Sequence, residues 1–326
     1  MSTPQQHIGS GFLPTNTAED VARGIDLHGK NIIVTGGSSG LGAEAVRVFV
    51  NQGAQVFVPA LDVENAKKAL SSIGVTTATV EHLDLSKAGS IKSYAQNFLA
   101  RNIPLHILVN NAAIMGAATV QLNEEGIEAH FAVNHLGHFQ LTVLLKPALV
   151  KANGARVVTV SALMHRRTPV IFDDINFKNR RYDVLSGYAQ SKTANSLFVV
   201  ELDRRWKQHQ IRAFSVHPGI SFETNLSKHQ DKDFFAKLGA VGADGKLRTA
   251  GTKTIEQCSS TTVFAAVSPK LSGLGGVYLE DNEVTLKTTD PNLRPPFGGV
   301  EPYAVDPGQA AKLWTLSEEL TGVREE

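Results

Sequence analysis

The sequence predicts one doubly wound α/β domain, with a seven-stranded parallel sheet covered by helices on both faces. Three observations lead to this fold class. Short runs rich in valine and isoleucine alternate with longer segments of helical spacing along most of the chain. Several of these runs are apolar on both faces, as is typical of buried parallel strands. A glycine-rich turn follows the first run and opens a helix.

The predicted elements follow one another in regular alternation. The strands are expected at 31–36, 54–60, 76–85, 105–112, 155–161, 211–217 and 275–280. The helices are expected at 40–52, 63–72, 87–100, 124–149, 183–209 and 251–267. Because each strand is followed by a helical crossover, the strands should run parallel. Residues 1–28 are expected to be a loosely attached N-terminal arm. Residues 29–326 would form the single domain, with a substrate lid at about 220–250 and a C-terminal extension at about 281–326.

Composition excludes several classes of protein. The 326 residues suffice for one large domain, and 42% hydrophobic with 19% charged residues is ordinary for a globular enzyme. The net charge of +1 and the lack of a basic stripe give no support to a nucleic-acid or membrane partner. Cys258 is the single cysteine, so no intrachain disulfide can form and a cytoplasmic location is expected. Neither a secretory signal, a membrane span nor a metal site is predicted.

The stretch VTGGSSGLG places a glycine-rich turn between a strand and a helix. Gly36, Gly40 and Gly42 would let the backbone turn tightly and approach a pyrophosphate closely. The helix N-terminus would then offer unpaired N–H groups to the phosphates. A structural turn without a ligand is the alternative. The strand before the turn and the helix after it favour a dinucleotide site in a Rossmann-type domain.

Three further motifs carry chemistry. Asn110 and Asn111 fall at the carboxyl end of the fourth predicted strand, at the edge where open α/β sheets bind ligands, although asparagine also suits a plain turn. Asn134 lies on an apolar helical stripe and therefore needs a buried partner. Tyr188 and Lys192 are spaced i, i+4 on one helical face. A solvated helix face is the alternative, but a nearby ammonium could lower the pKa of the tyrosine and fit it for acid–base catalysis.

Together these motifs resemble the short-chain dehydrogenase/reductase family from about residue 28 to the C-terminus. The segments NHLGHFQLT, FDDINF, YAQSKTAN and FSVHPG resemble its retinol-dehydrogenase-like and WW-domain-oxidoreductase-like branch, in the soluble bacterial or fungal form. The resemblance implies reversible hydride transfer between a nicotinamide cofactor and a small, largely apolar carbonyl or alcohol. Relatives are often dimers or tetramers, so a homo-oligomer is expected, but no interface can be located in the sequence.

The resemblance also assigns roles to residues. Tyr188 would exchange the proton, Lys192 would lower its pKa and hold the nicotinamide ribose, and Asn134 would extend the proton relay. The implied cofactor contacts are Gly36, Ser38, Ser39, Gly40, Leu41, Gly42, Leu61, Asp62, Asp84, Leu85, Asn111, Ala112, Ala113, Tyr188, Lys192, Pro218, Gly219 and Ile220. The expected substrate contacts are His165, Phe222, Phe234 and Phe235.

The chain departs from the family at the catalytic serine. The branch pattern V-S-S-x-x-H-R aligns with residues 160–166 and puts Ala162 where the family has the serine that hydrogen-bonds the substrate carbonyl. Ser161 is one substitute, although neighbouring strand residues point to opposite faces. His165 is another. Loss of such a donor costs about 10²–10³ in rate in other enzymes, so the sequence predicts a slow enzyme. An engineered serine-to-alanine change is also compatible with the sequence.

The cofactor preference and the reaction leave alternatives open. Ala60 and Leu61 occupy the positions that select NAD or NADP in relatives, and neither residue decides. The branch favours NADP(H), with NAD(H) as the alternative. Thr224 is one residue later than the threonine of the family, so its role as a ligand is in doubt. Reduction of an imine C=N bond and a dinucleotide-binding sensor or scaffold with little turnover are the rival functions.

Overall fold

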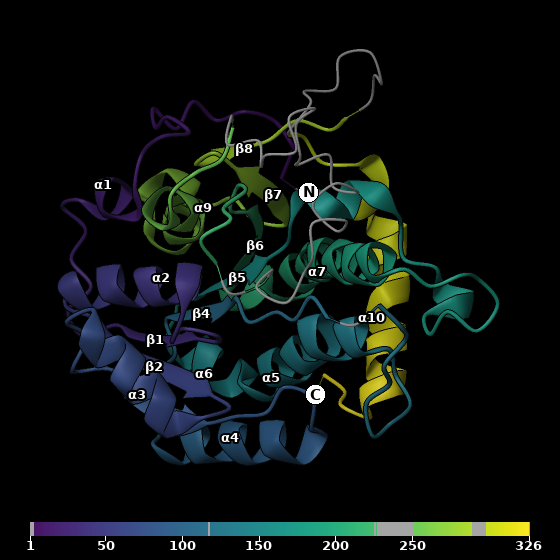
Figure 1. The fold of residues 1–326 in the computed structure, drawn as a ribbon. Coiled ribbons are helices and arrows are strands. Elements are labelled where there is room, and N and C mark those ends of the chain that lie inside the picture. Colours follow the sequence, from purple (N-terminus) through teal and green to yellow (C-terminus); the bar gives the residue numbers. More distant parts are fainter. Residues whose placement is uncertain (1–2, 117, 225, 227–250, 289–297, 326) are drawn as a thin grey trace, which may run out of the picture.

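The computed structural model describes residues 3–116, 118–224, 226, 251–288 and 298–325. One eight-stranded sheet lies at its centre, in the order β3-β2-β1-β4-β5-β6-β7-β8 (Figure 1). The parallel strands are β1 (Asn31–Val34), β2 (Gln55–Ala60), β3 (Thr79–His82), β4 (Ile107–Asn110), β5 (Arg156–Val160), β6 (Arg212–His217) and β7 (Val277–Glu280). The predicted fold class is confirmed. The strand that sequence reasoning missed is β8 (Glu283–Val284), which is antiparallel to β7.

The sheet reverses its winding direction between β1 and β4. These strands are neighbours in the sheet, with Ile32 paired to Ile107, although two strands and three helices separate them in the chain. In doubly wound sheets, ligands bind at the carboxyl ends of the strands at this reversal. The fold therefore places the glycine turn after β1 and Asn111 after β4 on the two sides of one crevice.

Helices cover both faces of the sheet (Figure 1). The α-helices are α1 (Ala18–Ala22), α2 (Gly40–Asn51), α3 (Val63–Ser72), α4 (Ala88–Ala100), α5 (Gly137–Leu144), α6 (Lys146–Lys151), α7 (Val184–Trp206), α9 (Ile255–Val267) and α10 (Pro307–Thr321). The 3-10 turns are η2 (Leu163–Arg167), η3 (Phe172–Asp174), η4 (Lys207–His209), η6 (Pro269–Leu271) and η7 (Pro302–Val305). Within the described ranges, no helix is long and apolar enough to cross a membrane.

The helix predicted at 124–149 is not continuous. It begins as a π-helical segment, η1 (Phe131–Leu136), continues as α5, and ends as α6, which carries Pro147 in its first turn. Proline cannot donate a backbone hydrogen bond and is tolerated at this place in a helix. Because π-helical turns occur often at functional sites, the position of Asn134 within η1 is informative.

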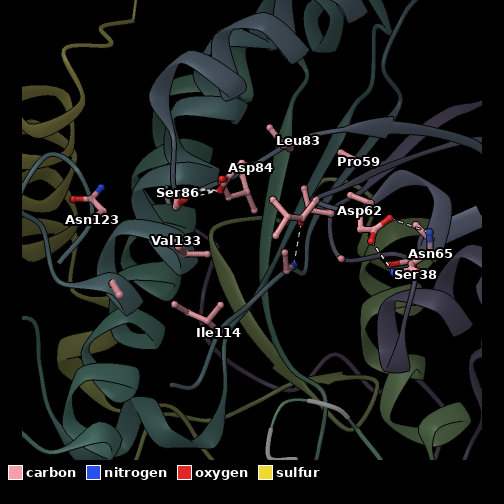
Figure 2. Close-up of a pocket in the computed structure, with 18 of the residues that line it drawn as sticks. Ser38, Pro59, Asp62, Asn65, Leu83, Asp84, Ser86, Ile114, Asn123 and Val133 are labelled. Carbon is pink, nitrogen blue, oxygen red and sulfur yellow. Dashed lines mark hydrogen bonds between the residues drawn. The ribbon is translucent and has the colours of Figure 1, made fainter. Parts of the chain in front are cut away.

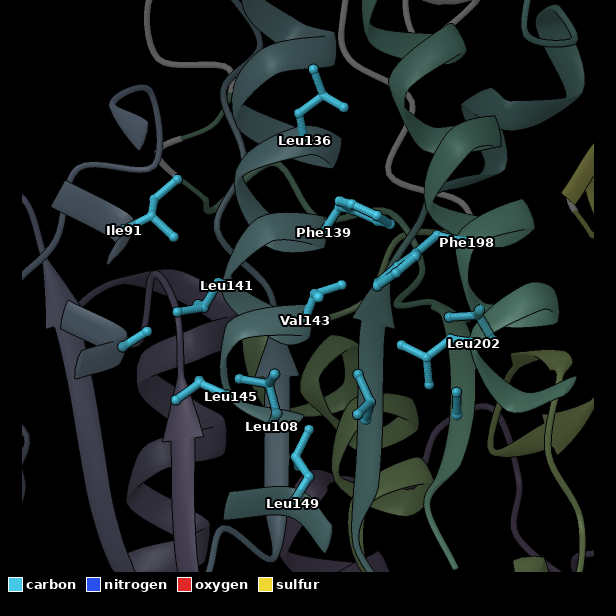
Figure 3. Packing of buried hydrophobic residues seen from close by; sticks show 14 of the residues in the cluster. Ile91, Leu108, Leu136, Phe139, Leu141, Val143, Leu145, Leu149, Phe198 and Leu202 are labelled. Atoms are coloured by element: carbon cyan, nitrogen blue, oxygen red, sulfur yellow. The ribbon is translucent and has the colours of Figure 1, made fainter. Parts of the chain in front are cut away.

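Two apolar clusters fill the space between the sheet and its helices. Leu108 of β4 packs into one cluster with Phe139 of α5 and Phe198 of α7 (Figure 3). The next strand residue, Val109, points to the opposite face and joins a cluster with Phe264 of α9. Each fully buried side chain of this size contributes roughly 1.5–3 kcal/mol. Strands that are apolar on both faces are thus explained by burial on both sides.

The N-terminal residues bind the far edge of the sheet. The side chain of Gln5 donates to the carbonyl of Tyr278 (2.6 Å) and accepts from its N–H (3.0 Å). The carboxylate of Glu283 accepts from the N–H groups of Ile8 (2.8 Å) and Ser10 (2.7 Å). Helix α1 packs against α9 through buried alanine and valine side chains. The expectation of a loosely attached arm is therefore wrong for the described residues 3–28.

Candidate active site

The glycine turn has the geometry that its spacing predicts. Gly36 and Gly40 adopt φ angles of +63° and +50°, a region that favours glycine. A Cβ atom on Gly42 would lie 2.3 Å from the carbonyl oxygen of Gly36, so this position also requires glycine. Ser39 caps α2 without a side-chain hydrogen bond to the helix. The first N–H groups of α2 and the Ser39 hydroxyl are thus available to a phosphate.

A cavity of about 820 Å³ lies over the carboxyl ends of β1 to β4 (Figure 2). Its volume is within the range of cofactor sites. The predicted cofactor residues in its lining are Gly36, Ser38, Leu61, Asp62, Asp84, Leu85 and Ala112. Sequence reasoning missed other lining residues, among them Thr35, Pro59, Ile114, Leu122 and Val133. The hydrogen-bonding groups that line the cavity and the glycine turn at its edge fit a dinucleotide.

Two aspartates, Asp62 and Asp84, lie in the lining of the cavity, together with Glu124. Asp62 caps α3 by accepting from the N–H of Asn65 (3.0 Å) and from its side-chain amide (2.6 Å). Asp84 accepts from the N–H of Ser86 (2.9 Å) and from its hydroxyl (2.5 Å). Figure 2 shows both carboxylates beside the cavity. Among the described lining residues, none is a lysine or an arginine.

Tyr188 and Lys192 lie together on α7, as their spacing predicts. Helix α7 begins after Asp183, whose carboxylate accepts from the N–H of Ser186 (3.1 Å). Both side chains are buried, with 5% and 1% of their surface exposed. The Lys192 Nζ donates to the carbonyl of Val160 at the end of β5 (2.9 Å) and lies 5.5 Å from the centre of the Tyr188 ring. The alternative of a solvated helix face is thereby excluded.

Asn134 has the buried partners that its place on an apolar stripe requires. Its side-chain oxygen accepts from the N–H of Ile114 (2.8 Å), and its amide donates to the carbonyl of the same residue (3.1 Å). The amide also donates to the hydroxyl of Ser191 (3.0 Å), which donates in turn to the carbonyl of Tyr188 (2.7 Å). Asn134 thus links the segment after β4 to the helix that carries Tyr188.

Burial sets the protonation of the Tyr188–Lys192 pair. It raises the pKa of Tyr188 above its ordinary value, because a buried phenolate loses its hydration. It lowers the pKa of Lys192 to about 7 for the same reason. The expected lowering of the Tyr188 pKa by Lys192 is not seen. The ammonium donates to Val160 rather than to the phenol, and the cost of burial dominates.

The buried ammonium of Lys192 should make stability depend on pH. The folded pKa of about 7 lies below the ordinary 10.5, so the unfolded chain binds more protons between these values and stability rises with pH. At pH 6 we expect Lys192→Met to raise the free energy of unfolding by about 2 kcal/mol, since it removes a buried charge. At pH 9.5 this gain should shrink. Urea unfolding at both values measures the difference.

The control for this prediction is Lys68→Met, which removes an exposed lysine of α3. It should change stability by less than about 0.5 kcal/mol at either pH. A gain from Lys192→Met that is the same at pH 6 and pH 9.5 would contradict the burial argument.

The residues around Ala162 differ in how far they can serve as donors. The Ser161 hydroxyl donates to the carbonyl of Lys192 (2.8 Å) and accepts from Ser196 (3.0 Å), so it is directed at α7. The ring of His165 is fully buried and bonded at both nitrogens, to the carbonyl of Ala162 (2.7 Å) and the N–H of Glu301 (3.1 Å). Neither group is placed to bond a substrate, so the structure does not support the two substitutes considered for the missing serine.

The turn after β6 is held by neighbouring residues. Gly219 has a φ of +97°, and a Cβ there would lie 2.7 Å from the Lys253 side chain. The carbonyl of Ile220 accepts from the N–H of Lys253 (2.8 Å). The methyl group of Thr224 would be 3.7 Å from a Cβ on Gly40, so Thr224 lies beside the glycine turn.

The expected substrate residues are only partly described. Phe222 is half-buried just after the turn that follows β6. Phe234 and Phe235, with most of the expected lid at 220–250, lie outside the described residues. In the part of the chain that is described, no group of three His, Cys, Asp or Glu side chains is arranged to hold a metal ion.

Comparisons with known proteins agree with this geometry. The family model for short chain dehydrogenases matches residues 30–233. A probable oxidoreductase of Streptomyces lividans is 39% identical over 294 residues, covering 89% of this chain and 97% of its own. Human retinol dehydrogenase 12 is 34% identical, covering 92% of this chain and 89% of its own. The crystal structure of an uncharacterised protein from Mycobacterium paratuberculosis superposes with a TM-score of 0.72 at 29% identity, over 96% and 99% of the two chains.

A doubly wound sheet with a glycine turn at its reversal point and a buried tyrosine–lysine pair defines a dinucleotide-dependent oxidoreductase. The chain belongs to the short-chain dehydrogenase/reductase family, in the branch that includes the retinol dehydrogenases. It is an NAD(P)-dependent dehydrogenase or reductase.

Proposed function

We propose that this enzyme transfers a hydride between NAD(P)(H) and a small, largely apolar carbonyl or alcohol. The observation that carries the proposal is the burial of Tyr188 and Lys192 beside the carboxyl end of β5. Ile114, which lies in the cavity lining and is 38% exposed, supports an apolar substrate. When bound, the nicotinamide supplies or accepts the hydride.

The residues of the chain would manage the proton. Burial keeps the Tyr188 phenol protonated at neutral pH, so Tyr188 donates its proton to the substrate oxygen in the direction of reduction. Lys192, with a pKa of about 7, holds the nicotinamide ribose and exchanges a proton near neutral pH. Asn134 extends this relay and, through Ser191, fixes the position of Tyr188.

The turnover experiment decides between this function and its rivals. The oxidation of NADH and NADPH would be followed with a panel of aldehydes, ketones and cyclic imines. Turnover of an aldehyde or ketone is the expected result. Turnover of the imines alone would favour C=N reduction, which needs no carbonyl donor at Ala162. Tight binding of a dinucleotide without turnover of any compound would favour the sensor or scaffold.

The charge of the cavity supports NAD(H) as the preferred cofactor, although the resemblance to the branch favours NADP(H). Asp62 follows β2, where relatives bind the ribose 2′-position, and the described lining offers no cation to a 2′-phosphate. We therefore expect NADH to bind at least about tenfold more tightly than NADPH. Titration calorimetry with each dinucleotide measures the ratio. Tighter binding of NADPH would contradict the expectation.

Leu61→Arg provides the matched test of this preference. Leu61 is 68% exposed in the cavity lining, so an arginine there would cost little packing and could pair with a 2′-phosphate. It should move the preference toward NADPH by about tenfold. Leu13→Arg, at a residue that is 64% exposed and absent from the lining, makes the same charge change and should leave the ratio unaltered.

A further inference from the structure

His138 of α5 is a buried histidine to which the proposed function gives no role. Only 1% of its surface is exposed. Both ring nitrogens nevertheless have a partner. Nδ1 lies 3.0 Å from the carbonyl oxygen of Asn134, and Nε2 lies 2.9 Å from the hydroxyl oxygen of Thr35. The imidazole therefore bridges the helix that carries Asn134 and the residue that follows β1.

The partners of the ring determine where its proton lies. A carbonyl oxygen can only accept, so Nδ1 carries the proton and donates it to Asn134. Nε2 is then an acceptor, and the Thr35 hydroxyl donates to it at 2.9 Å, a shorter distance than the 3.3 Å to its other acceptor, the carbonyl of Val109. Burial lowers the pKa of His138 to about 4, which keeps the ring neutral and preserves this arrangement at neutral pH.

The orientation of the Thr35 hydroxyl has a consequence for the segment after β4. While its proton is directed at His138, its oxygen accepts the N–H groups of Asn111 (2.9 Å) and Ala112 (3.0 Å). The sequence assigns both residues to the cofactor site. The imidazole thus contacts the residue that bonds the wall of the cavity.

The hydrogen bond from His138 to the Asn134 carbonyl lies in the π-helical part of the helix. In the π-helical segment η1 the backbone N–H groups reach back five residues instead of four, as that of Gly137 does to Ala132. The side chain of His138 donates to the carbonyl four residues before it. The peptide of Asn134 is thereby held on one side by His138, while its side chain is held by Ile114 and Ser191.

We infer that His138 is a positioning residue, which fixes the Asn134 peptide and the Thr35 hydroxyl relative to each other. The inference rests on the proposed function, in which Asn134 belongs to the proton relay. His138 does not touch the substrate or the Tyr188 phenol. It acts by fixing Asn134 relative to α7 and to the cavity wall at the same time.

Two substitutions distinguish the two hydrogen bonds of the ring, because each keeps one of them and removes the other. The amide of His138→Asn can occupy the place of Nδ1 and donate to the Asn134 carbonyl. The longer His138→Gln reaches the place of Nε2 and loses the donor at Nδ1. Asparagine is the smaller side chain and leaves the larger void, so His138→Asn should be the less stable of the two variants. A residue that served only to fill space would therefore give lower activity in His138→Asn.

The inference predicts the opposite order for function. We expect the kcat of His138→Asn to stay within about threefold of the wild type, and that of His138→Gln to fall about 10- to 100-fold. The affinity for NADH should stay within about threefold in both variants, since the Thr35 hydroxyl can donate to the carbonyl of Val109 (3.3 Å) and still accept from Asn111 and Ala112. Urea unfolding gives the order of stability. A kcat that follows the order of stability would overturn the inference.

Amide exchange gives a readout that does not depend on turnover. The N–H of Ile114 is held by the Asn134 side chain, so deuterium uptake of peptides spanning 111–116 reports on the placement of Asn134. Uptake should be about tenfold faster in His138→Gln than in His138→Asn. Equal uptake would overturn the inference. If the wild type binds NADH but turns over no compound of the panel, the proposed function fails and this exchange result alone decides the role of His138.

Discussion

Replacing Tyr188 with phenylalanine is expected to lower kcat by a factor of about 10²–10⁴, the range for loss of a positioned acid–base group. The change keeps the ring that packs in this buried site, where Tyr188 is only 5% exposed, and removes the hydroxyl that would give its proton to the substrate. Binding of NADH should persist, because the glycine turn and the cavity lining are untouched. Steady-state turnover and a dinucleotide titration measure the two effects separately.

Tyr182→Phe is the matched control. Tyr182 precedes α7, is partly exposed, and its hydroxyl lies 3.5 Å from Nδ1 of His130. Its loss should change kcat by less than about threefold, because the group is outside the proposed relay. A Tyr188→Phe variant as active as the wild type would show that the proton comes from another group, and the proposed mechanism would have to be abandoned.

Replacing Ala162 with serine is expected to raise kcat/KM for carbonyl substrates about 100-fold. Ala162 lies two residues after β5 and precedes η2, with an extended backbone, φ −163°, that any residue adopts, and it is half-buried. A serine there would supply the hydroxyl to which the resemblance assigns the bond to the substrate oxygen. The measurement compares turnover of the same aldehydes and ketones by the two proteins.

Ser161→Ala tests the neighbouring position. The Ser161 hydroxyl is bonded within the protein, to the carbonyl of Lys192 and to Ser196. Its removal should cost about 1 kcal/mol of stability and leave turnover nearly unchanged. If serine at position 162 adds nothing while the chain with Ala162 turns over a substrate well, the site uses a different donor or a different reaction.

Much of the fold could be predicted because burial on both faces leaves a strong pattern in the strands. Val157 and Val158 pack into opposite clusters, and this is why their strand is a continuous apolar run. The same alternation of faces predicts that Ser161 points away from the substrate. Its hydroxyl donates to the backbone carbonyl of Lys192 on α7. Strand β8 was missed because two residues, Glu283 and Val284, carry no periodicity.

The rest of the site depends on contacts that no local pattern encodes. The contact of His138 with Thr35 joins residues 103 positions apart, and the bond of Asn134 to Ser191 joins residues 57 positions apart. The sequence offers His165 as a candidate donor, but the N–H of Glu301, far along the chain, donates to its second nitrogen. The sign of the pKa shift of Tyr188 depends on burial, which composition does not reveal.

The contact of the N-terminal residues with β7 and β8 also affects how well the edge of the sheet is covered. Strand β8 is only two residues long, and beyond it the carbonyl of Tyr278 accepts from the N–H of Thr285 (3.2 Å). The side chain of Gln5 accepts from the N–H of Tyr278 and donates to the carbonyl groups of Tyr278 and Thr285. An uncovered strand edge is a template on which other chains can pair and aggregate. Gln5, Ile8 and Ser10 occupy bonding groups at that edge, so we expect residues 3–10 to limit the pairing of further strands with β7 and β8.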